Sequence, residues 1–202
     1  GSGAIGSGAV LAPGLLTFHD YEVRFTSPTA YAIVDATTGN TVRGNYVGTA
    51  IAAPSSTTPV SIITGSNDTL TVTVDGVASG TITLTGAASP GFSYSSGDAL
   101  ALEIQTRINA DATLQAAGRA VSVVFDGTTG RFVLTSADSS VSSAVDVTGG
   151  TARSTLGLVS GTSTAATGTY AGPAVLNFDG LSVTITGPPA AGDVFRADSY
   201  TD

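Results

Sequence analysis

The 202-residue sequence contains no cysteine, no methionine and no tryptophan, and it has one histidine. Without cysteine there can be no disulfide, no thiolate catalysis and no cysteine-based zinc or iron–sulfur site. A single histidine, His19, excludes a metal site built from several histidines. We therefore expect no catalytic residue of the cysteine class, no metal ligands and no cofactor.

Charge is scarce, and one sign dominates. Charged residues make up 11% of the chain, the seven basic residues are all arginine, and the formal net charge is −8. An acidic surface repels phosphate backbones and anionic headgroups, so we expect no nucleic acid and no membrane as partner. No apolar run approaches the ~20 residues that span a bilayer. The N-terminus also lacks the basic region and apolar stretch of a secretory signal peptide.

The ionisable residues offer little for catalysis. His19 precedes Asp20, but adjacent residues at a strand edge point to opposite faces, so we interpret His19 as an exposed loop residue. No G-x-S-x-G nucleophile elbow occurs in the sequence. Glu22 and Glu103 fall on a predicted strand and a predicted helix, where each is explained by a solvated face. We predict that the protein is not an enzyme.

Several short motifs have structural explanations. Residues 1–6 spell G-x-G-x-x-G, but no strand precedes them and no helix follows, as a dinucleotide site requires. A calcium loop needs several oxygen ligands in one turn, and the repeated Asp-Gly pairs supply one aspartate each. We predict hairpin turns at these pairs, which are Asp75-Gly76, Asp126-Gly127 and Asp179-Gly180. Asn67-Asp68-Thr69 is a glycosylation sequon in spelling only.

Alternating apolar and polar residues predict strands in both terminal parts of the chain. The alternating runs are 21–26, 31–35, 41–47, 175–178, 181–185 and 194–195. The central part mixes strands with helix. Leu100, Ile104 and Ile108 recur at helical spacing, and Ser95 and Asp98 stand at capping-box spacing before them. A short second helix, 112–117, is expected between the capping residue Asp111 and a terminating Gly118. Hairpins over 70–85 and 121–135 and a strand over 144–148 complete this part.

Two segments rich in Ser, Thr and Ala, the first with two prolines, lack an apolar period and are interpreted as linkers, 52–66 and 160–169. The predicted fold class is mainly β with an α+β insert. Residues 1–51 and 170–202 would form one discontinuous all-β outer domain. Residues 67–159 would form the inserted α+β domain, with hairpins packed on one helix.

The insert resembles a known module. Residues 67–76, then Ser96-Gly97-Asp98-Ala99-Leu100, Arg107-Ile108-Asn109-Ala110, residues 131–136 and Thr155-Leu156-Gly157-Leu158 resemble the flagellin-hook IN module, whose name comes from the Ile108-Asn109 pair. The flanks, through residues 20–26, 178–187 and 189–195, resemble the outer β-domain of bacterial flagellar hook-associated proteins. Arg196-Ala197-Asp198-Ser199 departs from the apolar residue and proline that usually follow in that family.

This resemblance implies a structural part of the flagellum, from a first- or third-type protein that joins hook to filament. It implies export through the flagellar channel to an extracellular location. It also implies contact with neighbouring axial subunits, namely hook, other hook-associated proteins and flagellin, although the fragment alone is expected to be monomeric. Tyr21, Phe25 and Tyr31 are candidate contact residues, but their period of two favours burial. The alternative is a surface-exposed carbohydrate-binding or adhesin-like module, although sugar platforms favour tryptophan, which is absent.

Overall fold

The computed structural model describes residues 1–6, 8–85 and 90–198. Its fold is mainly β, with antiparallel sheets and one long helix, which confirms the predicted fold class. The strands of the terminal parts are β1 (Ala4–Ile5), β2 (Ala9–Val10), β3 (Asp20–Ser27), β4 (Ala30–Asp35), β15 (Thr167–Thr169), β16 (Ala174–Phe178), β17 (Leu181–Thr186) and β18 (Val194–Asp198). The remaining strands are β5 (Asn45–Val47), β6 (Val60–Ile63), β7 (Thr69–Val74), β8 (Val77–Ala78), β9 (Ile82–Thr83), β10 (Gly91–Tyr94), β11 (Val121–Asp126), β12 (Arg131–Ser136), β13 (Val145–Gly149) and β14 (Thr162–Thr164).

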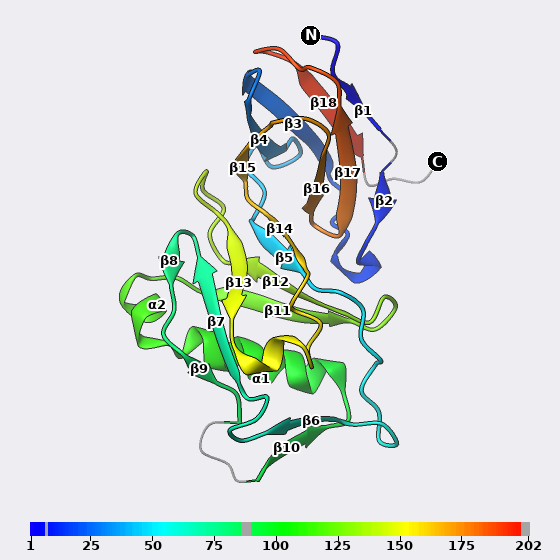
Figure 1. The fold of residues 1–202 in the computed structure, drawn as a ribbon. Coiled ribbons are helices and arrows are strands. Elements are labelled where there is room, and N and C mark those ends of the chain that lie inside the picture. The colour runs from blue at the N-terminus through cyan, green and yellow to red at the C-terminus, as the bar shows by residue number, and fades with distance from the viewer. Residues whose placement is uncertain (7, 86–89, 199–202) are drawn as a thin grey trace.

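The strands from both chain ends enclose one hydrophobic cluster, the terminal core (upper part of Figure 1). One sheet has the order β15-β4-β3-β18, and the other pairs β1 and β2 with β17, which pairs with β16. Side chains from both sheets interdigitate, because alternate residues of each strand point inward. The rings of Tyr21 and Phe178 lie 5.0 Å apart across the core. The members of the terminal core are Tyr21, Val23, Phe25, Ile33, Val42, Tyr170, Leu176, Phe178, Leu181, Val183 and Ile185.

A second and larger cluster, the helical core, lies around α1 (Gly97–Asn109) in the lower part of Figure 1. Leu100, Ile104 and Ile108 of this helix are fully buried, as their spacing predicts. They share this core with residues of β11, β12 and β5 and of β7, β9 and β13. The short helix α2 (Ala112–Ala116) begins after Asp111, whose carboxylate accepts hydrogen bonds from two backbone amides. It ends before Gly118, which has a φ of 66°.

The cap of α1 differs from the prediction by one residue. Ser96, with extended backbone angles, accepts a hydrogen bond at its Oγ from the Ala99 amide, so it is the N-cap in place of Ser95. Two predicted Asp-Gly turns have positive φ at both residues, namely Asp75-Gly76 and Asp179-Gly180. This is the geometry of the tight hairpin turn that suits twisted strands.

Parts of both predicted linkers are strands. β6 lies within 52–66, pairs with β10 and buries Ile62, whereas β14 and β15 lie within 160–169. β5, expected to extend the flanking sheet, pairs instead with β12 and β14. β14 and β15 form by backbone pairing with strands distant in sequence, which leaves no local periodic signal. The first and last parts of the chain nevertheless share the terminal core, while residues between them build the helical core.

Candidate functional site

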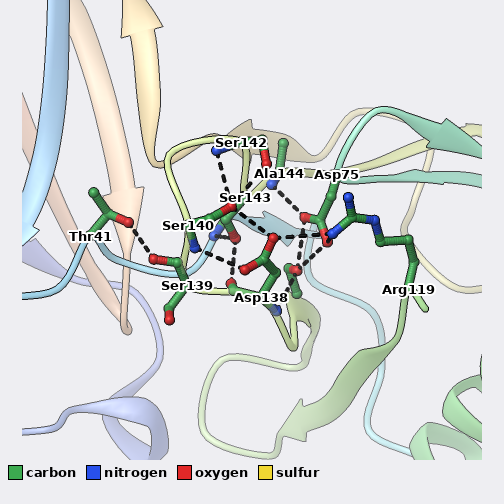
Figure 2. A network of polar contacts seen from close by, with 11 residues as sticks. Thr41, Asp75, Arg119, Asp138, Ser139, Ser140, Ser142, Ser143 and Ala144 are labelled. Carbon is green, nitrogen blue, oxygen red and sulfur yellow. Dashed lines mark hydrogen bonds and ion pairs between the residues drawn. The ribbon is translucent and has the colours of Figure 1, made fainter. Parts of the chain in front are cut away.

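The two cores meet at a joint held by a network of polar contacts. It comprises β5 and β14, which carry the chain between the cores, and residues 137–144, which connect β12 to β13. We call residues 137–144 the joint loop. Figure 2 shows this loop and the side chains that hold it.

The joint loop bonds to segments that lead out of the terminal core. Thr41 donates its hydroxyl hydrogen bond to the carbonyl of Ser139. The Ala166 amide donates to the Ser143 carbonyl at 2.9 Å, and Ala166 in turn accepts a hydrogen bond from the amide of Ile33, a residue of the terminal core. The joint loop is thus connected to the terminal core through main-chain hydrogen bonds.

Gly44 brings two backbones into direct contact at the joint. Its amide donates to Ser143 Oγ at 2.8 Å, and its carbonyl accepts from the Ser136 amide at 2.9 Å. A Cβ added at Gly44 would lie 2.3 Å from the Cα of Ala144. Only glycine permits this approach, because the obstructing atoms belong to the main chain.

Asp75, in the turn between β7 and β8, anchors the joint loop from the side of the helical core. Its side chain is 1% exposed. Ser136 Oγ donates to Asp75 Oδ1 at 2.8 Å, and the Ala144 amide donates to the same oxygen at 3.0 Å. Arg119 Nη1 lies 3.6 Å from Asp75 Oδ2. A buried carboxylate with this set of donors fixes the loop against β12 and the β7–β8 turn (Figure 2).

Arg119 also joins Asp75 to Asp138 within the loop. Its Nη1 lies 3.2 Å from Asp138 Oδ2. Hydrogen bonds from the side chain and backbone amide of Ser140, together with the charge of Arg119, lower the pKa of the Asp138 carboxyl despite its partial desolvation. The loop therefore carries an ionised carboxylate that organises its own serines.

Apolar packing and a buried hydrogen bond complete the joint. Ala12 and Leu15, from the N-terminal segment, pack against Val47 of β5 and Val133 of β12. The buried Thr164 of β14 accepts, at its Oγ1, a hydrogen bond of 2.9 Å from the amide of Asn177 in β16. The joint is therefore held from both sides of the two connecting strands.

A polar cavity of about 300 Å³ lies beside the joint and contains the residue that the sequence singled out, His19. His19 Nδ1 is 2.8 Å from Asp35 Oδ2, a carboxylate 16 residues later in the sequence. The His19 side chain is 32% exposed. The cavity is lined by Thr17, His19, Asp35, Thr38, Asn40, Thr41, Val42, Arg43, Ser139 and Asp179.

Two carboxyls at this cavity have opposite pKa shifts. Burial would raise the pKa of Asp35, but hydrogen bonds from His19 and from the Thr38 amide outweigh burial and lower it. Burial raises the pKa of Asp179, although a hydrogen bond from Tyr21 and the charge of Arg43 oppose the rise. Burial likewise raises the pKa of Tyr21. The pKa of Asp35 is lowered because it accepts hydrogen bonds in a turn, and the pKa values of Asp179 and Tyr21 are raised because both groups are buried.

The other candidate residues are dispersed. Glu22 pairs with Arg24 and Arg196 on the sheet surface, and Glu103 pairs with Arg107 on α1. Tyr21 and Phe25 are core residues, as their period predicts. Among residues 1–6, 8–85 and 90–198, no group of three or more His, Asp or Glu side chains is placed to hold a metal ion, and no helix is long and apolar enough to cross a membrane. The serines of the joint loop and Asp138 were not singled out by the sequence, because their loop composition resembles that of any turn.

Comparison with known proteins gives one distant likeness. No protein-family model and no curated protein matches the sequence. Among solved structures, the crystal structure of FliD (HAP2) from Pseudomonas aeruginosa PAO1 aligns with 99% of this chain and 85% of that chain, at 17% identity and a TM-score of 0.34. At this TM-score the likeness carries no argument about function.

Proposed function

We propose that the chain is a structural outer part of a bacterial flagellar hook-associated protein, of the type that joins the hook to the filament. In this role the chain is not an enzyme and needs no cofactor. Its partners are neighbouring axial subunits, and its location is extracellular. The resemblance of residues 67–158 and of both flanks to that family motivates the proposal.

The observation that carries the proposal is the joint. Residues from the segments that resemble the family meet there: Asp75 anchors the loop, and Gly180 accepts backbone hydrogen bonds from Leu11 and Ala12, beside the apolar part of the joint. A subunit between two filaments of different stiffness bears bending load, so its parts must keep their relative orientation. Two cores joined by paired strands and buried polar bonds meet that requirement.

Immunogold electron microscopy tests the proposal. Antibodies raised against this chain are applied to intact flagella of the source bacterium, with flagella from a strain that lacks the gene as the control. Label confined to the boundary between hook and filament is expected. Label at the distal tip, along the filament or on the cell body would contradict the proposed position.

A motility assay provides the second test. Deleting the gene should leave cells with hooks but without attached filaments, and the full-length gene should restore swimming in soft agar. Cells that lack the gene and still carry filaments of normal length would exclude a role in joining the two structures.

A further inference from the structure

We propose that Asn109 and Gln105 of α1 occupy the outer edge of β11 and thereby prevent a second copy of this chain from pairing with that edge. β11 is the end strand of the sheet β11-β12-β5-β14. In the part of the chain that the structure describes, no strand pairs with its outer edge. A free strand edge is a template for pairing with another chain.

Asn109 satisfies both main-chain groups of one edge residue. Its Nδ2 donates to the Val121 carbonyl at 2.9 Å, and its Oδ1 accepts from the Val121 amide at 2.9 Å. This reciprocal pair has the pattern by which two residues of antiparallel strands bond to each other. The side-chain amide of Asn109 therefore takes the place of a peptide group of a neighbouring strand.

Gln105 continues the pattern one helical turn earlier. Its Oε1 accepts from the Val123 amide at 2.9 Å. Four residues of helix advance by about 6 Å, and two residues of strand advance by about 6.8 Å, so amides four apart on a helix match alternate residues of a strand. α1 runs antiparallel to β11, because Asn109 faces Val121 while Gln105 faces Val123.

The start of the helix covers the far end of the strand. A Cβ added at Gly97 would lie 2.0 Å from the Phe125 ring, so α1 lies directly against this residue. Val121, Val123 and Phe125 all direct buried side chains into the helical core, beneath α1. The helix thus lies along the strand and presents polar groups where a fifth strand would otherwise add.

Once the amide bonds of α1 are removed, the occupant that fits this edge is β11 of a second copy. An antiparallel strand pairs with an identical strand about a two-fold axis, so one edge is complementary to itself. The outward side chains Ser122 and Val124 are exposed, and neither carries a charge that would oppose such pairing. The protection therefore comes from α1, whose two amide side chains bond to the main-chain groups of this edge.

The test removes the amide of Asn109 and measures self-association of the whole chain by analytical ultracentrifugation. Asn109→Ala should associate at least ten-fold more tightly than the parent chain. Thr106→Ala, at an exposed position of the same helix, is the matched control and should behave as the parent does. Alanine favours helix more than asparagine does, so loss of α1 is not the expected consequence.

Hydrogen exchange identifies the edge. At concentrations at which Asn109→Ala is monomeric, the Val121 amide should exchange at least ten-fold faster, while the amides of β7 keep their parent rates; association should slow the Val121 amide again. Gln105→Ala is the milder variant and should accelerate Val123 without accelerating Val121. Uniform acceleration across β7 and β11 would show general destabilisation and overturn the proposal.

A charge on the strand provides the final arm. Asn109→Ala combined with Val124→Lys should return to the association of the parent chain, because paired copies would place two lysines at one edge. Association that survives Val124→Lys would overturn the proposal, as would an Asn109→Ala chain whose association and Val121 exchange equal those of the parent.

Discussion

Replacing Asp75 by alanine should weaken the joint more than replacing Asp126, which also begins an Asp-Gly turn. The substitution leaves two buried donors, the Ser136 hydroxyl and the Ala144 amide, without their acceptor. Hydrogen bonds to a charged group contribute about 1.5–3 kcal/mol each. Alanine at the φ of 49° found at Asp75 adds about 1 kcal/mol of strain. We therefore expect the free energy of unfolding to fall by about 4–7 kcal/mol.

Urea unfolding followed by circular dichroism measures this loss. Asp126→Ala is the matched control, since Asp126 also begins an Asp-Gly turn of the helical core but its side chain bonds to Thr128 and Thr129 beside it. Its loss should be about 1–2 kcal/mol. Hydrogen exchange at Ala144 and Ala166 should accelerate in Asp75→Ala only. Equal losses for the two variants, with unchanged exchange at Ala166, would refute the role of Asp75 in the joint.

Three further substitutions probe the joint and the neighbouring cavity. Gly44→Ala should cost about 3 kcal/mol in urea unfolding, because its Cβ meets backbone, whereas Gly127→Ala, which has open space around it, should be tolerated. Asp179→Asn should raise the free energy of unfolding at pH 7, because the raised pKa of Asp179 means that the folded state disfavours its ionised form. That gain should shrink as the pH falls toward 3, and a constant gain would contradict it. Asp35→Asn should lower the free energy of unfolding at pH 7, because Asp35 has a lowered pKa, and the loss should vanish as acid protonates the parent carboxyl.

Local signals predicted the helices well. The spacing of Leu100, Ile104 and Ile108 places one face of α1 in the core, and the caps at Asp111 and Gly118 lie within a turn of the helix they bound. Such features depend on residues close in sequence. The exact N-cap was not predicted. Ser95 and Ser96 both carry a hydroxyl that could cap the helix, and only the backbone conformation identifies Ser96 as the cap.

The connecting segments could not be predicted in the same way. β14 is Thr162-Ser163-Thr164 and has no apolar period, yet it pairs with β5, more than a hundred residues earlier. Threonine suits a pleated surface, so such a segment can join a sheet once a partner edge is present. Its composition predicts a linker, because the strand that pairs with it lies far away in the sequence.

The sequence predicts Asp75 as a turn residue but does not predict its contacts in the joint. The Asp-Gly pair correctly predicts a hairpin turn, and the turn explains the aspartate by itself. Its second role depends on Ser136 and Ala144, which lie 61 and 69 residues later. A turn aspartate with distant partners has the same local sequence as one without them, so Asp75 looks like Asp126 and Asp179.

The joint makes the connection between the two cores stiffer than two flexible linkers would. A flexible linker of ten residues would have a root-mean-square span of roughly 17 Å and would let the cores swing independently. Here β5 and β14 pair with each other and with β12, and the joint loop bonds to Thr41 and Ala166 across the boundary. Bending the cores apart therefore loads several main-chain hydrogen bonds and the buried Asp75 contacts together. This resistance to bending comes from hydrogen bonds and strand pairing at the joint. A chain with few charges and no disulfide can therefore still hold two cores in a fixed orientation.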